Sequence, residues 1–368
     1  MTMTTPPYAD RLTRLRHRMT ETATDLVVLG PSSHMMWLSG VNPHGDERPV
    51  LLMVSQSHAG FLMPGLNADA ARKSTDLPFR CWSDDDGPDA ALTALLSDCD
   101  ATAGGLSVVL DETMRADFAL RVLDAMDAPK RRFTDDTVGL LRAMKDDAEY
   151  DALKAAHLLN DAAVTEAFSL LEEGMSELDV QAILHAHYKA HGASAEFTIV
   201  GFGANGAFPH HHTGDTRLSR DMAVLIDTGC RLNGYPSDMT RCGWFGTPEA
   251  EYEQVFGVVE AAVQAAVQAA KPGVRASEVD RAARETIAAA GYGPQFLHRT
   301  GHGLGIDVHE PPYITATSDV ELRAGNVFSI EPGIYLKDRF GVRLEEIVIL
   351  REDGAEILSE MPRTMQRR

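Results

Sequence analysis

The chain opens with short apolar runs that alternate with mixed, helix-like segments. Runs rich in valine and leucine predict strands at 25–30, 50–54 and 106–111. The segments around them predict helices at 8–21, 67–74, 89–98 and 114–126. Strands that alternate with helices indicate a small α/β domain, which we place at residues 1–136.

A polar run, NPHGDERP at 42–49, lies between two apolar segments of this domain. A solvated loop is the ordinary interpretation of such a run. The alternative interpretation is a loop that reaches toward an active site, across a dimer interface.

The remainder of the chain, 137–368, begins with helical patterns. Apolar positions at helical spacing predict a long helix over 146–171. A second helix is predicted over 176–191, with Ser176 as its cap and Asp179 as the capping partner three residues later.

A similar helix pair follows about a hundred residues later. The pattern predicts helices over 248–270 and 277–291, the first with a cap at Thr247 followed by proline. The segment 171–180 is echoed by 270–280. We interpret the two pairs as a degenerate internal duplication whose halves share a site between them. Chance similarity of two helical hairpins is the alternative.

Composition and charge limit the classes of protein that remain. A formal net charge of −20, from 54 acidic and 34 basic residues, argues against nucleic acid as the main partner. No run reaches the ~20 apolar residues of a membrane span, and no apolar stretch near the N-terminus predicts a signal peptide. The four cysteines show no CxxC spacing, so we expect reduced structural thiols and a cytoplasmic protein without membrane contact.

Five short motifs in the C-terminal part each hold one potential metal ligand. They are Asp227 in AVLIDTG, Asp238 in YPSDMTR, His302 in RTGHGLG, Glu331 in FSIEPGIY and Glu345 in GVRLEEIVI. Four carboxylates and one imidazole form a hard, oxygen-rich set. Such a set suits paired divalent ions that activate a water molecule.

The two aspartates are expected on a hairpin-like pair of strands. Asp227 is predicted to end the apolar strand 222–226, and Gly229 to let the chain turn. Asp238 precedes the strand-like stretch 240–245, where Thr240 could orient its neighbourhood. A single aspartate in such a place is more often a turn residue, so the prediction depends on the later motifs.

His302 and Glu331 carry different local signals. Glycines surround His302, which indicates either a flexible loop or a backbone that approaches a metal cluster. Glu331 interrupts an apolar run just before Pro332 and Gly333. Because a buried carboxylate without a partner is costly, a metal ion is a suitable partner for it.

Glu345 is predicted to lie within a continuous strand, VRLEEIVIL. Strand alternation puts Arg343 and Glu345 on one face and Glu346 on the other, so only one of the two glutamates points at a given site. Arg343 could orient a ligand carboxylate from that face.

The order and surroundings of these motifs resemble the pita-bread metallopeptidases, and most closely their Xaa-Pro dipeptidase (prolidase) and aminopeptidase P branch. The resemblance is strong over 140–360 and weak before it. It implies a creatinase-like α/β N-terminal domain at 1–136 and an α+β pita-bread catalytic domain at 137–368. The family pattern is Ile-Glu-Asp where this chain has Leu344-Glu345-Glu346, so the ligand is kept and its surroundings differ.

The resemblance also implies the chemistry. The expected reaction is hydrolysis of the Xaa-Pro peptide bond, mainly in dipeptides, by a hydroxide that bridges two metal ions per subunit. Mn²⁺ is the expected ion, with Co²⁺ or Zn²⁺ as alternatives. Asp227 is expected to hold one ion, His302 and Glu331 the other, while Asp238 and Glu345 bridge. Glu331 is also expected to shuttle the proton, and the subunits to form a homodimer.

Further site residues follow from the same resemblance. His210, in the run PHHHTGD, and His309, in DVHEPPYI, are expected to contact the carbonyl oxygen or the departing amide nitrogen of the peptide. Among the three consecutive histidines, the register favours His210. Arg299 is a weaker candidate for binding the carboxylate of the substrate.

Other functions are weighed against this one. Gly201 to Gly206 fits GxGxxG, but Pro209 and three histidines follow where a dinucleotide site needs a helix. Aminopeptidase P, which acts on longer peptides with proline second, is the nearest alternative. Creatinase-like hydrolases lack this ligand set, and pita-bread proteins that only bind typically lose ligands, whereas all five are present here.

Overall fold

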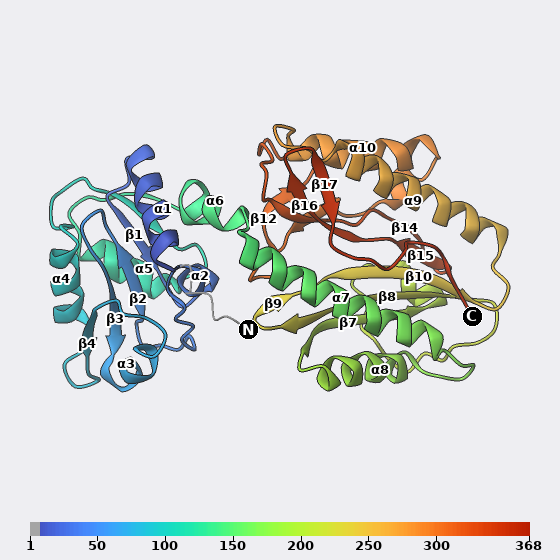
Figure 1. Ribbon diagram of the computed structural model, residues 1–368, viewed down its shortest axis with the longest axis horizontal. Helices are drawn as coiled ribbons and strands as arrows, with labels where there is room; N and C mark the ends of the chain where they lie inside the picture. The colour runs from blue at the N-terminus through green and yellow to red at the C-terminus, as the bar shows by residue number, and fades with distance from the viewer. Residues whose placement is uncertain (1–7) are drawn as a thin grey trace. The chain divides into compact units, whose positions relative to one another are not determined.

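The computed structural model describes residues 8–368 and divides into two compact units, Met1–Arg142 and Ala143–Arg368 (Figure 1). The sequence placed the domain boundary between 136 and 137, just before the short helix α6 (Val138–Ala143). Within the described residues, no helix has both the length and the apolar character that crossing a membrane requires.

The first unit is built on a mixed sheet with strand order β4-β3-β2-β1-β5-β6. Its strands are β1 (Leu26–Leu29), β2 (Leu51–Val54), β3 (Ala59–Pro64), β4 (Phe79–Trp82), β5 (Ser107–Leu110) and β6 (Lys130–Arg132). The three predicted strands are confirmed as β1, β2 and β5, which are almost wholly buried. Strands β3, β4 and β6 were not predicted. Exposed residues dominate β4 and β6, whereas β3 is wholly buried and its short run AGFLMP contains glycine and proline.

Helices complete this unit. They are α1 (Tyr8–Glu21), α2 (Ser33–Ser39), α3 (Gly65–Ala71), α4 (Asp89–Asp98), α5 (Ala116–Asp124), the 3₁₀ helix η1 (Thr134–Asp136) and α6. The four predicted helices correspond to α1, α3, α4 and α5. Leu92, Leu95 and Phe118 pack from α4 and α5 against the sheet, in one buried cluster with Val108. The polar run 42–49 has neither helix nor strand and is largely exposed, as a solvated loop would be.

The second unit begins with two helices whose starts are both capped, and of these caps only the one at Ser176 was predicted. Helix α7 (Asp147–Ser169) has a capping box between Asp146 and Glu149, and α8 (Glu177–Ala190) has one between Ser176 and Asp179. They pack on a sheet of order β18-β10-β8-β7, in which β9 also pairs with β8. Its strands are β7 (Ser194–Phe202), β8 (Met222–Leu232), β9 (Tyr235–Pro236), β10 (Met239–Phe245) and β18 (Gln366–Arg367).

The second helix pair is α9 (Ala250–Ala269) and α10 (Ala276–Ala289). Helix α9 begins two residues later than predicted, because Glu249 rather than Thr247 is its cap. A second sheet has the order β12-β11-β13-β16-β17, and β14 and β15 form a separate hairpin. These strands are β11 (Gly301–Gly303), β12 (Glu310–Ile314), β13 (Val327–Ile330), β14 (Gly333–Leu336), β15 (Phe340–Arg343), β16 (Glu346–Arg351) and β17 (Gly354–Ile357).

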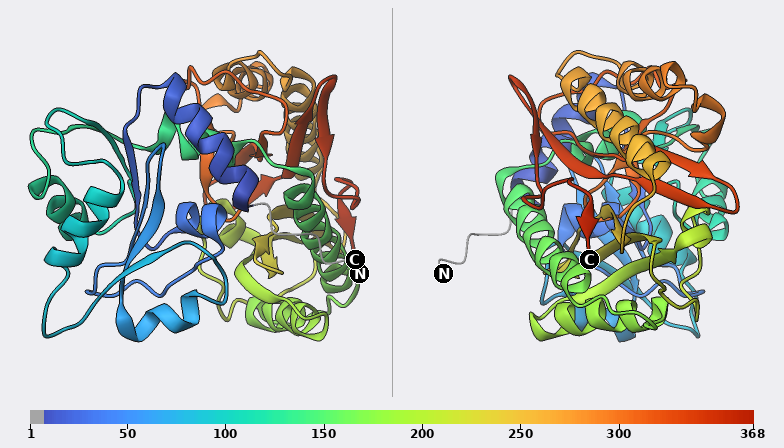
Figure 2. Two further views of the ribbon diagram at one scale, coloured as in Figure 1. Left: turned by 60° about the vertical axis from the view of Figure 1, so that its left-hand side comes forward. Right: turned by 90° about the vertical axis from the view of Figure 1, so that its right-hand side faces the viewer.

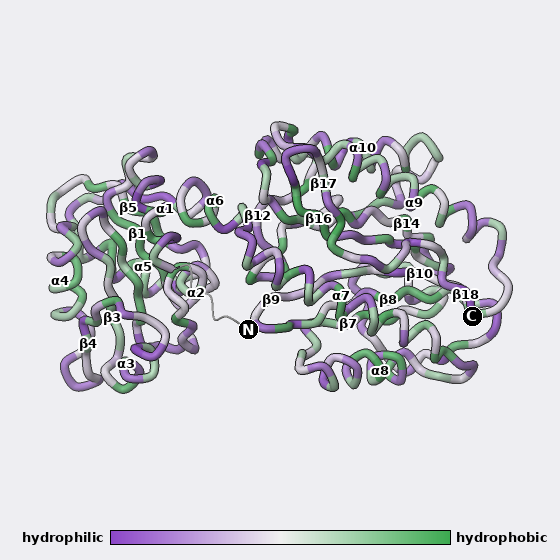
Figure 3. The backbone as a smooth tube through the Cα atoms, in the orientation of Figure 1, coloured by the Kyte–Doolittle hydropathy of each residue, from purple (hydrophilic) through white to green (hydrophobic). Residues whose placement is uncertain are grey.

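The two helix pairs lie on opposite sides of the strands of this unit (Figures 1 and 2). Successive side chains of β8 point to opposite faces, so this strand contributes to the hydrophobic cores on both sides. Val224 and Ile226 belong to the core under α7 and α8, whereas Ala223 and Leu225 belong to the core under α9 and α10. Figure 3 shows the apolar stretches along the strands of both units, which is the pattern that the sequence carried.

Candidate metal centre

One cavity of ≈ 730 Å³ in the second unit collects the predicted ligands. Its walls include Asp227, Asp238, His302, Glu331 and Glu345, together with His210, Arg299, His309 and Arg343. These side chains come from separate elements spread over more than a hundred residues of sequence. The fold therefore brings together all five predicted ligands and four further predicted site residues, with Thr240 directly behind them.

Strands β8 and β10 bring in the two aspartates. They pair antiparallel, with Asp227 opposite Thr240, and Asp238 directly precedes β10. The prediction that Asp227 ends its strand is wrong, because β8 continues to Leu232. Gly229 does not turn the chain either. A Cβ there would lie 2.1 Å from Ser237 O, so this glycine allows close packing within the sheet.

His302 enters the cavity from β11, which lies between β12 and β13. Its glycine neighbours serve the packing of strands rather than an approach to a metal: a Cβ at Gly301 would lie 1.8 Å from Ser329 O. The imidazole Nδ1 is 3.1 Å from Gly303 O, and a carbonyl can only accept a hydrogen bond. The Nδ1 nitrogen therefore carries the proton, which leaves Nε2 to face Glu331 and Asp238 at 3.2 and 3.6 Å.

The two glutamates both sit where a strand has just ended or is about to begin. Glu331 follows β13, and the Ser329 hydroxyl donates to its Oε1 at 2.9 Å. Glu345 lies between β15 and β16, which belong to different sheets, so the prediction of one continuous strand is wrong. The prediction that only one of the paired glutamates faces the site is confirmed, because Glu345 lines the cavity and Glu346 binds Arg241 on the other side.

Arg343 and Thr240 hold these carboxylates in place. The Arg343 guanidinium donates to Asp227 Oδ2 at 2.6 Å and to Thr240 Oγ1 at 2.9 Å. Thr240 Oγ1 in turn donates to Glu345 Oε2 at 2.9 Å. Thr240 therefore orients Glu345, whereas the sequence suggested the neighbourhood of Asp238. Arg343 also donates to the Tyr335 hydroxyl at 2.8 Å.

Burial and mutual repulsion govern the protonation of the cluster. Burial, followed by the charges of neighbouring carboxylates, raises the pKa values of Asp238 and Glu345 well above their ordinary range. Burial also raises the pKa of Asp227, against the lowering effect of Arg343. Burial alone would raise the pKa of Glu331, but the hydrogen bond and charge of His302 outweigh it and hold that pKa at about 2.

This arrangement fits divalent metal ions. Ligand atoms of Asp238, His302 and Glu345 lie within 4.8 Å of one another. Asp227 Oδ1 is buried without a hydrogen-bond partner among the described residues, although buried carboxylate oxygens are normally paired. Cations would supply that partner and offset the repulsion among four carboxylates.

The three consecutive histidines separate in space. His210 lines the cavity, whereas His211 Nε2 lies 2.8 Å from Glu177 Oε2, a buried carboxylate in the first turn of α8. His309 packs edge-on against His302, with ring centroids 4.0 Å apart. Burial and the proximity of His302 lower the pKa of His309 to about 4, so it is neutral at pH 7. Arg299 lies over the ring of Tyr313 at 4.8 Å.

Three residues of the site were missed by the sequence reasoning. His298 lines the cavity and lies 2.7 Å from the Tyr335 hydroxyl, which bridges it to Arg343. His157 lies in the predicted long helix, and its Nε2 accepts the backbone N–H of Asp238 at 3.4 Å. The sequence placed His157 among core positions and gave no signal for Tyr335. For His298, the one signal in the sequence was its place shortly before the predicted ligand His302.

Two other motifs do not form competing sites. Gly203–Ala207 is the 3₁₀ helix η2, and no α-helix begins at the GxGxxG segment, as predicted for a chance match. His34, Asp111 and Glu112 in the first unit also have ligand atoms close together. Arg142 Nη1 lies 3.1 Å from His34 Nδ1, and this positive charge opposes a cation there. All four cysteines are free, as predicted for reduced thiols.

Comparison with known families agrees with the two units. Residues 11–135 match the family model of the creatinase/prolidase N-terminal domain, and residues 151–352 match that of metallopeptidase family M24. The M24 match contains all five predicted ligands together with His210, His309 and Arg299. The predicted fold, a creatinase-like domain followed by a pita-bread domain, is confirmed.

Three similar proteins span nearly the whole chain. The probable dipeptidase PepE of Mycobacterium tuberculosis is 35% identical, over 96% of this chain and 95% of the relative. The Xaa-Pro dipeptidase of Pyrococcus furiosus is 32% identical, over 97% and 99%. The crystal structure of an X-Pro aminopeptidase from Thermotoga maritima superposes with a TM-score of 0.84 and 29% identity, over 97% and 99%.

Proposed function

This chain belongs to metallopeptidase family M24, and from that premise we propose that it hydrolyses the bond between an amino-acid residue and a following proline, mainly in dipeptides. The observation that carries the proposal is the set of five predicted ligands on one cavity, of which all but the partly exposed Glu331 are buried. The names of its relatives, a dipeptidase and an Xaa-Pro dipeptidase, support the substrate class.

We assign to each ligand the role that the family resemblance implies. Asp227 would hold one divalent ion, His302 and Glu331 the other, and Asp238 and Glu345 would bridge them. Mn²⁺ is the expected ion, with Co²⁺ or Zn²⁺ as alternatives. Bound ions of this kind lower the pKa of a water molecule and polarise a carbonyl group. The carboxylates of the site supply the negative charge that two such ions require.

The remaining side chains provide binding and proton transfer. By the family resemblance, Glu331 would accept a proton from the attacking water and pass it to the departing nitrogen. The neutral imidazole of His309 and the imidazole of His210 would hydrogen-bond the carbonyl oxygen or the amide nitrogen of the scissile bond. Hydrogen bonds from Arg343 and Thr240 hold the carboxylates of Asp227 and Glu345 in position.

Arg299 would set the length of the substrate. Its guanidinium lines the cavity and is supported by the face of Tyr313, which leaves its hydrogen-bond donors available to a carboxylate. A dipeptide presents its terminal carboxylate one residue after the scissile bond, whereas a tripeptide presents it farther away. Arg299 therefore favours dipeptides, and its loss should raise KM for a dipeptide about tenfold or more.

The test compares Ala-Pro with Ala-Pro-Ala as substrates of the metal-loaded protein and of Arg299→Ala. Cleavage of Ala-Pro alone, with a raised KM in the variant, supports the dipeptidase. Preference for Ala-Pro-Ala would favour the aminopeptidase alternative. That is the activity in the name of the similar Thermotoga maritima protein. Absence of cleavage of either peptide, with metal bound, would overturn the peptidase assignment. We also propose a homodimer, as the family resemblance implies, and a cytoplasmic location, on the ground of the cysteine pattern.

A further inference from the structure

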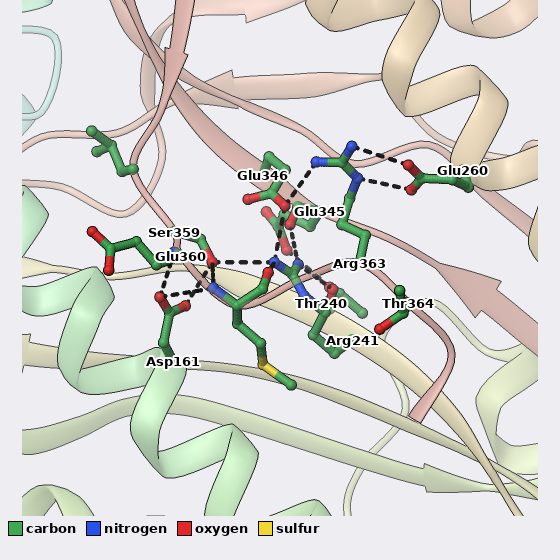
Figure 4. A network of polar contacts seen from close by, with 12 residues as sticks. Asp161, Thr240, Arg241, Glu260, Glu345, Glu346, Ser359, Glu360, Arg363 and Thr364 are labelled. Carbon is green, nitrogen blue, oxygen red and sulfur yellow. Dashed lines mark hydrogen bonds and ion pairs between the residues drawn. The ribbon is translucent and has the colours of Figure 1, made fainter. Parts of the chain in front are cut away.

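A buried arginine supports the metal centre from behind. The Arg241 side chain is fully buried on β10, on the strand face opposite Thr240. Its Nη1 donates to Glu345 O at 2.6 Å and to Thr240 O at 3.2 Å. Figure 4 shows this guanidinium directly beside the backbone that carries Glu345. One side chain therefore binds the main chain of two residues whose side chains form the site.

Glu346 fixes the orientation of that guanidinium. Its Oε1 accepts from Arg241 Nη2 at 2.9 Å and from Arg363 Nη1 at 3.0 Å. Arg363 extends the chain of contacts outward to Glu260 on α9, through two bonds of 2.8 and 3.0 Å. Glu346 is the residue at which this chain departs from the family pattern, where an aspartate is usual.

The same arginine reaches the segment before the C-terminus. Arg241 Nη2 donates to Met361 O at 2.7 Å and to Ser359 Oγ at 3.2 Å. Asp161 on α7 holds this segment by accepting from Ser359 Oγ and Glu360 N, both at 2.6 Å. Helices α7 and α9 thus both anchor the network that ends on Glu345 (Figure 4).

Glu345 needs such support because of its place in the chain. It lies in the break between β15 and β16, where no strand pairing fixes it on both sides. Its N–H donates to Thr240 O at 3.2 Å, its C=O accepts from Arg241, and its Oε2 accepts from Thr240 Oγ1. Removing the Arg241 contact would free the main chain and shift the carboxylate relative to Asp238 and His302.

We propose that Arg241, oriented by Glu346, is a positioning residue for the bridging carboxylate of Glu345. The inference rests on the ligand set of the proposed function but not on the substrate. Hydrogen bonds to ligands of this kind commonly change metal affinity by about 10- to 100-fold when they are lost. Arg241 accordingly controls how tightly, and in what geometry, the ions are bound.

The test compares Arg241→Lys with Arg363→Lys as a matched control. Both changes keep the positive charge that faces Glu346 and replace a planar guanidinium by an ammonium group. Of the two arginines, only Arg241 touches the backbone of Glu345. Co²⁺ affinity is measured by competition with a chelator, and the Co²⁺ centre by its visible absorption. We expect Arg241→Lys to weaken Co²⁺ binding about tenfold or more and to change the spectrum, and Arg363→Lys to change affinity less than about twofold.

Equal affinities and spectra in wild type and Arg241→Lys would overturn the proposal, as would equal effects of the two lysine variants. If Arg241→Lys does not fold, Glu346→Gln decides, because it keeps the size of the side chain and removes the charge that orients Arg241. A folded Glu346→Gln protein with wild-type affinity and spectrum would also overturn it. Neither measurement uses a peptide. A failure to hydrolyse Xaa-Pro bonds would therefore contradict the proposed function and not the role of Arg241.

Discussion

His210 is distinguished from its neighbours by position alone. It lines the cavity, whereas His211 binds Glu177 and His212 is exposed on the same loop. We expect His210→Ala to lower kcat by about 10²- to 10³-fold with unchanged metal content, because it removes a hydrogen bond to the reacting peptide and no proposed ligand. His212→Ala is the matched control and should retain wild-type turnover. An unchanged rate in His210→Ala would remove this residue from the site.

His157 makes the stability of the fold depend on pH. Its imidazole is fully buried, and burial lowers its pKa from 6.5 to about 4. Between these values the unfolded chain binds a proton here and the folded chain does not. The free energy of unfolding therefore falls as the pH falls through this window, by about 2 kcal/mol between pH 7 and pH 5, and becomes insensitive to this group above about pH 7.5.

Urea unfolding at pH 7 and pH 5 checks this expectation. His157→Gln keeps an acceptor for the Asp238 N–H and does not titrate, so the stability of the variant should fall less between the two pH values. Its stability at pH 7 should also be lower than that of the wild type, because a fitted core side chain has been replaced. Equal pH dependence in both proteins would exclude His157 as the source.

At the residue scale, the sequence predicted most of the polar side chains that line the cavity, but few of the residues that hold them in place. Ligand residues stand in short motifs that are recognised together, by their order along the chain. Tyr335, Ser329 and Arg241 act through contacts with residues that are far away in sequence, and nothing in their own neighbourhood marks them. The role of Thr240 was assigned to the wrong partner for the same reason.

At the element scale, the loop that carries His309 is held by a buried ion pair. Lys145 Nζ lies 2.6 Å from Glu310 Oε1, and the two side chains are 1% and 5% exposed. Glu310 Oε2 also accepts the N–H of Asp307 at 3.3 Å, within the same loop. Lys145 stands in a charged stretch that the sequence would assign to the surface, so this link was not predicted.

We expect Lys145→Met to cost about 3 kcal/mol or more in the free energy of unfolding, because it leaves the Glu310 charge buried without its partner. It should also lower kcat, since His309 follows the displaced loop. The double variant with Glu310→Gln removes that charge and should recover at least half of the lost stability. Denaturant unfolding of the single and double variants measures both effects, and simple additivity of the two losses would contradict this account.

The elements that were predicted well share one property, which is a pattern complete within their own sequence. The cap at Ser176 and the apolar strands β1, β2 and β5 are of this kind. The end of β8 and the break before β16 were misjudged, because tertiary contacts decide them. Asp227 continues a strand that pairs on both sides, and Glu345 crosses between two sheets.

At the scale of the whole molecule, the second unit alone supplies every residue of the candidate centre. Helices α7 and α8 pack on one side of its strands, and α9 and α10 pack on the other. The predicted duplication agrees with this arrangement, since each half contributes a helix pair. The first ligands come from β8 and β10, and the last three come from the strands that pack with α9 and α10.

The central claim is that these five side chains form a two-ion centre for hydrolysis before proline. The most direct measurement titrates chelator-stripped protein with Mn²⁺ while the cleavage of Ala-Pro is followed, in wild type and in Asp238→Asn. We predict no cleavage without metal, a rate that rises up to two equivalents per chain, and no recovery in the variant. Cleavage by the stripped protein at the full rate, or full recovery of Asp238→Asn with two equivalents, would contradict the claim.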